Sequence, residues 1–295
     1  MKQGSLIVLA MGLASMPAMA DEEVNRTIDA SDDGYIEIFN TSGNIEVTGW
    51  SRNSVQIDAV LGDSVEELIV ERDGNEILIR VEVPNRHWGD IEADLDIRVP
   101  EGSTIEVSGV STDIEIAGVL GEQSLGTVSG DIEVTGAADD IEAESVSGDV
   151  SITGDGGEGS IEAATVSGDV TVKNLSGSVE AESVSGDVEI IGGVFDDAYF
   201  ESVNGDLTFH ANLTSNGDLS LESVNGTVDI EFTEAVSARF DIETFNGSIR
   251  NCFGPKPERT SKYSPGLELS FTVGDGDARV EVETLNGSVN ICNQD

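Results

Sequence analysis

The fold is decided by a phrase that occurs three times between Ser145 and Ile190, in the stretch SVSGDVSITGDGGEGSIEAATVSGDVTVKNLSGSVEAESVSGDVEI. The phrase has the form Ser/Thr-apolar-Ser/Asn-Gly-polar-apolar-x-apolar, and it is centred on eight glycines: Gly130, Gly148, Gly168, Gly186, Gly205, Gly226, Gly247 and Gly287. Successive glycines are 18, 20, 18, 19, 21, 21 and 40 residues apart. A repeat of about 20 residues is typical of a solenoid, in which each coil buries its apolar face only against its neighbours.

Aligned on the glycine, the repeats show apolar columns separated by polar ones. Apolar, mostly β-branched residues stand two and four positions after the glycine, as in Val150 and Ile152, and another inward column stands five positions before it, as in Ala143. This alternation predicts strands. The position two before the glycine is also apolar, and we expect it to be core as well: Val128, Val146, Val166, Val184, Val203, Val224, Phe245 and Leu285. The glycine itself suits a corner that needs positive φ or close approach of two backbones.

The predicted fold is all-β: a right-handed parallel β-solenoid (β-helix) of about 20-residue coils, because parallel crossovers are almost always right-handed. Residues 103–295 carry the repeats, and residues 21–102 are predicted to form an irregular, strand-rich N-terminal cap continuous with them. Within the cap, Asp73-Gly74 lies between two apolar runs and predicts a β-hairpin. A propeller is excluded because its blades need about 40 to 45 residues.

Residues 1–20 have the pattern of a signal peptide: Lys2, an apolar stretch, and Ala18-Met19-Ala20 before Asp21. We therefore expect a periplasmic or secreted protein with no integral membrane segment after cleavage. Removing Lys2 from the 14 basic residues leaves 13, against 58 acidic ones, so the mature charge is −45. Such a charge makes nucleic acid and anionic membranes poor partners and makes divalent cations candidate ones; no cofactor is expected.

Cys252 and Cys292 are the only cysteines, each five residues after a repeat glycine. An even pair in an exported protein predicts a disulfide between them. Strict register argues against it. If Leu267–Val273 forms a complete rung between the two, they are separated by about 10 Å, beyond the roughly 7 Å limit for bridging.

Two acidic columns follow the repeat, and both are candidate calcium ligands. Glutamates stand four positions before the glycine, at Glu144, Glu182, Glu201, Glu222, Glu243 and Glu283, and aspartates stand one position after it, at Asp131, Asp149, Asp169, Asp187 and Asp206. The alternative is a solvated face, with aspartate serving the Gly-Asp corner. We predict no metal site, because regular columns lack the convergent geometry of a closed calcium site.

Catalysis is not expected. His87 and His210 are the only histidines, and their spacing suggests no Ser or Cys partner for either. Trp50 and Trp88 are candidates for a sugar platform or for packing in the cap. A carbohydrate-active β-helix enzyme is one alternative, and a structural envelope protein that assembles end to end is another.

Several phrases together resemble one bacterial exported family: NTSGNIEVTGW at 40–50, ADLDIRVPEGSTIEVSGVS at 93–111, TVSGDIEVTG at 127–136 and ETLNGSVNIC at 283–292. This is a β-strand-repeat family of unknown function that carries the label "putative adhesin". The resemblance implies a right-handed β-solenoid in the cell envelope with no assigned catalytic residues. The expected function is a non-enzymatic envelope or secreted solenoid that presents an acidic surface to an unknown envelope or surface ligand, for binding or adhesion.

Overall fold

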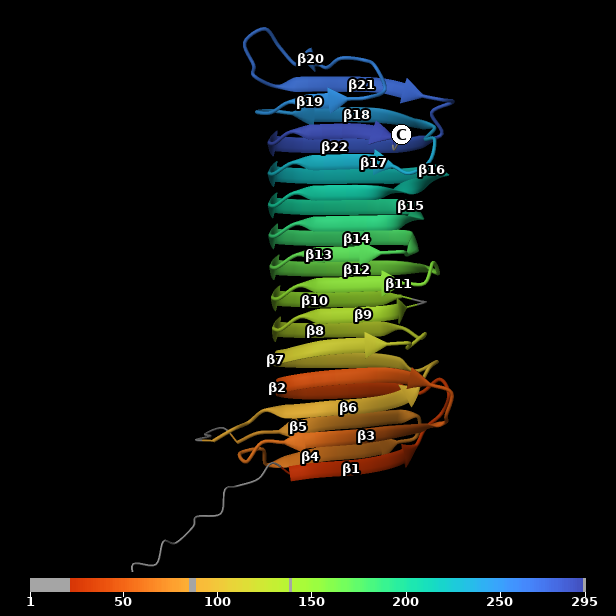
Figure 1. Cartoon of the computed structure of the whole chain (residues 1–295), viewed down its shortest axis with the longest axis vertical. Coiled ribbons are helices and arrows are strands. Elements are labelled where there is room, and N and C mark those ends of the chain that lie inside the picture. Colours follow the sequence, from red (N-terminus) through yellow and green to blue (C-terminus); the bar gives the residue numbers. More distant parts are fainter. Residues whose placement is uncertain (1–21, 85–88, 138–139, 294–295) are drawn as a thin grey trace, which may run out of the picture.

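The computed structural model describes residues 22–84, 89–137 and 140–293, and these residues form strands and turns without any helix. The strands are stacked as coils in one tall column (Figure 1). This confirms the prediction of an all-β, solenoid-like fold. The predicted signal peptide and the loop that holds His87 and Trp88 lie outside the described residues.

Each regular coil contributes one strand to each of two faces. We call the first the glutamate face, and its strands in spatial order are β8 (Gln123–Ser129), β10 (Ile141–Ser147), β12 (Glu158–Ser167), β14 (Ser176–Ser185), the second parts of β15 (Val188–Asn204) and β16 (Leu207–Asn225), β22 (Ala278–Asn286) and β18 (Ala238–Thr244). The opposite face holds β9 (Ile132–Ala137), β11 (Val150–Gly154), β13 (Val170–Lys173), the first parts of β15 and β16, β17 (Val228–Phe232), β23 (Val289–Asn293) and β19 (Ile249–Asn251). Neighbouring strands within these two sets are parallel.

The core lies between the two faces. Side chains two and four positions after the glycine, such as Val188 and Ile190, are fully buried, as are those five positions before it, such as Ala181. Towards the C-terminus the core widens to hold aromatic rings. Phe200 of the glutamate face lies 5.9 Å from Phe209 of the opposite face, measured between ring centroids, so side chains of the two faces meet in the middle.

At the N-terminal end the order of coils in space differs from their order in sequence. β2 (Tyr35–Trp50) pairs with β7 (Thr104–Ala117) on one side and with β5 (Glu76–Glu82) and β6 (Ala93–Pro100) on the other. After the coil of β2 the chain therefore runs toward the N-terminal end of the stack, and it comes back to pair with β2 through β5, β6 and then β7. The predicted hairpin is present: β4 (Glu67–Asp73) and β5 are antiparallel, and Gly74 in their turn has φ 63°. β3 (Ser54–Leu61) pairs antiparallel with β6, and β1 (Glu22–Asp29) pairs antiparallel with β3.

At the C-terminal end, too, the order of coils in space differs from their order in sequence. β22 and β23 come last in the chain, yet they insert between the coil of β16 and β17 and the coil of β18 and β19 (Figure 1). β21 (Leu267–Val273) runs antiparallel to β18 on its outer side and pairs with the short β20 (Glu258–Arg259). The expectation that residues 267–273 form a rung between the two cysteines is therefore wrong, because the glycine-rich turn at 274–277 reverses the chain.

Candidate functional site

The apolar column two positions before the glycine faces solvent, which overturns the prediction that it is core. Val128, Val146, Val166, Val184 and Val224 expose 36–47% of their surface, and Phe245 and Leu285 expose 51% and 48%. Val203 is half-buried. Side chains alternate between the two sides of a strand, so a column five positions before the glycine and a column two positions before it cannot both face inward. The glutamate face thus carries an exposed apolar ladder that crosses consecutive rungs.

The residue that is buried near this corner is instead the Ser or Thr three positions before the glycine. Ser145, Thr165, Ser183 and Ser202 are 95% buried or more, and each hydroxyl donates a hydrogen bond of 3.0–3.1 Å to the carbonyl oxygen of a repeat glycine in the neighbouring rung. A buried hydroxyl is tolerated where such an acceptor is available. The signal was present in the sequence, because every repeat has Ser or Thr at this position.

The repeat glycine is required by close approach and not by positive φ. A Cβ on Gly186 would overlap the carbonyl oxygen of Gly168 in the rung below, and Gly205 stands in the same relation to Gly186. Neither glycine has positive φ. The corners therefore stack backbone on backbone, and this stacking brings the flanking outward side chains into straight columns.

The aspartate column makes hydrogen bonds between rungs. The backbone N–H of Asp149 donates to Oδ1 of Asp131 at 2.9 Å, that of Asp169 donates to Asp149 at 2.8 Å, and the series continues through Asp187 and Asp206 to Thr227. Each carboxylate thus accepts a corner N–H of the next rung. These contacts support the interpretation that aspartate serves the Gly-Asp corner.

The glutamate column lies next to the apolar ladder. In register across adjacent rungs stand Glu182, Glu201, Glu222, Glu283 and Glu243. Partial burial, and then repulsion from Glu180 and Glu201, raises the pKa of Glu182 above its ordinary value. Partial burial, followed by repulsion from Glu201 and Glu283, likewise raises the pKa of Glu222. The column therefore holds negative charge that its neighbours do not compensate.

Two hollows follow this column and share Glu201. One, of about 560 Å³, runs from Ser108 to Val203, and the other, of about 300 Å³, continues to Leu285 and ends against Thr260 and Gly266. Their walls are built from the glutamate column, the Ser/Thr column and the apolar ladder, and among the described residues that line them there is no Lys, Arg or His. We call these two adjoining hollows together the rung groove.

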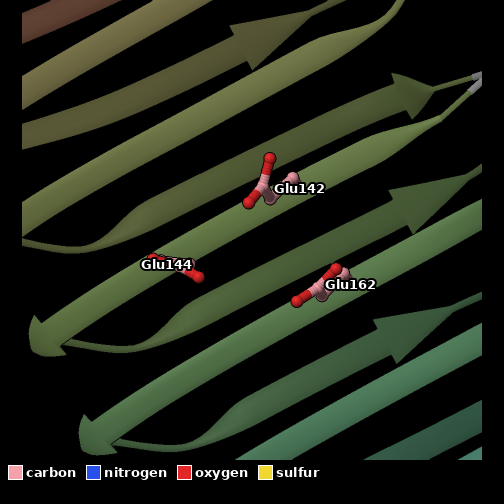
Figure 2. Close-up of side chains that lie close together, drawn as sticks. All are labelled: Glu142, Glu144 and Glu162. Atoms are coloured by element: carbon pink, nitrogen blue, oxygen red, sulfur yellow. The ribbon is translucent and has the colours of Figure 1, made fainter.

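Three glutamates at the N-terminal side of the glutamate face come close together (Figure 2). Carboxylate oxygens of Glu142, Glu144 and Glu162 lie within 4.8 Å of one another, and all three side chains are exposed. Slight desolvation of the Glu162 carboxyl group by its surroundings, then repulsion from Glu180, Glu142 and Glu144, raises its pKa. Calcium takes six to eight oxygen ligands, and a flat sheet face offers carboxylates from one side only. The cluster is therefore open compared with a calcium cage.

The histidine and tryptophan candidates lie apart from the rung groove where the structure describes them. His210 is on the opposite face, half-buried, with Nε2 3.5 Å from Oε2 of Glu231. Trp50 donates its indole N–H to the carbonyl oxygen of Ser54 at 2.8 Å, and the Arg52 guanidinium lies 4.9 Å from the ring centroid. One face of the Trp50 ring is thus occupied by Arg52.

The inserted C-terminal coil brings the two cysteines onto adjacent rungs. Cys252 donates its backbone N–H to the carbonyl oxygen of Ile291 at 3.0 Å, and the structure joins Cys252 and Cys292 by a disulfide with 5.0 Å between their Cα atoms. An amide ladder gives the same rung order: Asn225 donates to Asn204, Asn286 to Asn225 and Asn246 to Asn286. The two-rung separation expected from strict register does not occur.

A family model described as Toastrack DUF4097 matches residues 32–191 and 176–292 of the chain. The chain belongs to this family. The resemblance to a β-strand-repeat family of unknown function is thereby confirmed, and the match spans both the irregular N-terminal coils and the regular repeats of this Toastrack chain.

Solved structures also match, at low sequence identity. One from Bacteroides fragilis, described as a "putative adhesin", is 13% identical, with 94% of this chain and 99% of that one covered and a TM-score of 0.46. One from Parabacteroides distasonis, described as a "putative lipid binding protein", is 14% identical, with 92% and 96% covered and a TM-score of 0.43. One from Clostridium sporogenes, described as a "putative cell adhesion protein", is 9% identical, with 93% and 100% covered and a TM-score of 0.28.

No curated protein sequence matches the chain significantly. Within the part of the chain that the structure describes, no helix is long and apolar enough to span a membrane.

Proposed function

We propose that this protein is a non-enzymatic, exported binding protein that uses its glutamate face to hold positively charged components of the cell envelope or of a surface. The observation that supports the proposal is the unbroken column Glu182–Glu201–Glu222–Glu283–Glu243, which lies in a groove with no basic side chain among its described lining residues. Concentrated charge of one sign speeds the association of an oppositely charged partner and rejects those of like charge.

The proposal includes a right-handed coil and a capping role for the N-terminal strands. The right-handed sense follows from the general preference of parallel crossovers. The capping role follows from the antiparallel pairing of β1 and β3, since strands of this kind interrupt the parallel edge that would otherwise invite another chain.

The absence of catalysis is also part of the proposal. General acid–base chemistry on a sugar needs two carboxyl groups in different environments, one of them protonated. Here the pKa values of Glu162, Glu182 and Glu222 are all raised by the same two causes, desolvation of the carboxyl group and neighbouring glutamates. A repeating column of similar groups suits binding better than a division of roles.

A binding measurement on defined polymers tests this function. We expect the mature protein, coupled to a neutral sensor surface at 0.15 M salt, to retain polylysine and to retain neither polyglutamate nor neutral dextran. E201Q/E222Q/E283Q removes three charges from the glutamate column, and E115Q/E133Q/E189Q removes three from the opposite face as a matched control. Equal retention of polylysine by both variants, or release of reducing ends from a glycan panel, would contradict the proposal.

A further inference from the structure

The apolar ladder and the glutamate column run side by side along the rung groove. Glu182, Glu201 and Glu222 stand in successive rungs, and two residues after each comes an exposed or half-buried valine: Val184, Val203 and Val224. Leu285 and Phe245 continue the ladder beside Glu283 and Glu243. A partner that fits this surface must therefore present positive charge along one side and apolar groups along the adjacent side.

Backbone pairing cannot supply the binding. The strands that carry the ladder are paired on both sides, as β14 is with β12 and β15, so no free strand edge faces the groove. A partner is held by its side chains alone, across the strands and along the axis of the stack. This geometry excludes the addition of a further β-strand as the mode of recognition.

A second copy of this chain is a poor occupant. If two copies paired through their rung grooves, the glutamate column of one would face the glutamate column of the other. The described residues that line the groove include no Lys, Arg or His that could neutralise this charge. Like charges placed directly opposite each other are destabilising. The apolar ladder therefore points to a partner of opposite charge.

The rung spacing selects the conformation of that partner. Parallel strands lie about 4.8 Å apart, so alternate rungs repeat every ~9.6 Å. A polyproline II segment has three residues per turn and rises about 3.1 Å per residue, so side chains on one of its faces repeat every ~9.3 Å. An ordinary extended strand repeats on one face about every 6.7 Å and loses register within two rungs. The polyproline II conformation also needs no hydrogen bonds from the groove.

We propose that the rung groove between Glu182 and Phe245 binds an extended cationic polypeptide segment in the polyproline II conformation, with a basic residue at every third position and apolar residues between. The inference rests on the proposed function and names its partner class. Basic side chains would lie against glutamates of alternate rungs, and the apolar ones against the valine, leucine and phenylalanine of the ladder.

Two synthetic peptides test the proposal. A 15-residue peptide of five Pro-Val-Lys repeats should bind the mature protein at 0.15 M salt, and a peptide of five Pro-Ser-Lys repeats with the same charge should bind about tenfold more weakly. Isothermal titration gives both affinities. Equal affinities would overturn the proposal while leaving the proposed function intact, provided polylysine is still retained. Equal affinities together with loss of polylysine retention would contradict both this proposal and the proposed function.

Paired variants locate the site. V224S/L285S should weaken the Pro-Val-Lys peptide about five- to tenfold and leave the Pro-Ser-Lys peptide unchanged. V60S/V194S removes two valines that are 42% exposed outside the rung groove, and it should change neither affinity. E201Q/E222Q/E283Q should weaken both peptides about tenfold, against less than twofold for E115Q/E133Q/E189Q. Equal effects of the groove and control variants would overturn the proposal, and melting temperatures check that each variant is folded.

Discussion

Val184 and Val188 stand on either side of Gly186 and give opposite predictions from the same residue type. Val184 is 45% exposed, whereas Val188 is fully buried in register with Val170 and Leu207. Truncating Val188 to Ala removes two buried methyl groups and leaves a cavity, so we expect a loss of about 2 kcal/mol in the free energy of unfolding. Truncating Val184 should cost less than about 1 kcal/mol, since half of its surface already meets water.

Aspartate enlarges the difference. Val188→Asp loses the burial of a valine, about 2 kcal/mol, and must keep a carboxyl group neutral in the core. Holding the Asp pKa at or above 7 instead of about 3.9 costs about 4 kcal/mol at pH 7, so the sum is about 6 kcal/mol. Val184→Asp keeps its charge in water and adds repulsion beside Glu182, for a total of about 1 kcal/mol.

Equilibrium unfolding in urea, followed by far-ultraviolet circular dichroism, measures these losses. Because Val188→Asp can unfold the central coils outright, the two losses in free energy are compared quantitatively in the alanine variants of Val184 and Val188. The aspartate variants show only which of the two positions is the more sensitive. Unchanged m-values would show that the variants lose stability without a change in the surface exposed. Equal losses for the variants of Val184 and Val188 would refute the assignment of inward and outward columns.

Four further predictions follow from the stack. Gly186→Ala should destabilise by about 2 kcal/mol or more because its Cβ meets the neighbouring backbone, whereas Gly126→Ala, with nothing within 4 Å, should stay within about 0.5 kcal/mol; similar urea midpoints would contradict this. Asp149→Ala should cost about 1 kcal/mol by removing the acceptor for the N–H of Asp169, and Asp149→Asn should restore most of it; an asparagine variant no more stable than the alanine one would count against the corner role. Peptide mapping without reductant should recover the two cysteines in one cross-linked fragment, and alkylation of both thiols in freshly purified protein would reject the bridge. Glu162, Glu182 and Glu222, whose pKa is raised, bind protons more readily in the folded than in the unfolded chain, so their contribution to stability is fully present below the ordinary value of 4.5 and is lost as pH rises through the raised values. At low salt the melting temperature should therefore fall as pH rises above 4.5, and by more in the wild type than in the triple glutamine variant; parallel curves would refute this.

Local pattern alone was enough to predict the strands and the repeat. The columns at Val150, Ile152 and Ala143 alternate with polar residues, and the structure buries all three. The same reasoning holds for the hairpin at Asp73-Gly74, because a two-residue turn depends only on its own dihedral preferences. Each of these features is set by residues that are neighbours in the chain.

The exposed apolar ladder shows where hydrophobicity misled the prediction. Val184 is as apolar as Val188, so composition favours burying both, and only the period of the strand upstream of the glycine separates them. Ser183 shows the converse, since it is buried because its hydroxyl reaches the carbonyl oxygen of Gly168 in another rung. Counting the alternation forward from buried Ala181 puts Ser183 on the inner side and Val184 on the outer side, as the structure has them.

The sequence by itself determined that this chain forms a stack of two-strand coils, since every repeat carries its own strands and its own glycine corner. Only the tertiary structure decided the order of the coils. The last coil, with Cys292, lies beneath the coil that holds Cys252, and β2 lies between β6 and β7. Similar repeats offer similar edges, so local pattern does not say which coil will be the neighbour of which. The reversals of the chain at the two ends settle that order, and with it the line of glutamates and apolar side chains that forms the rung groove.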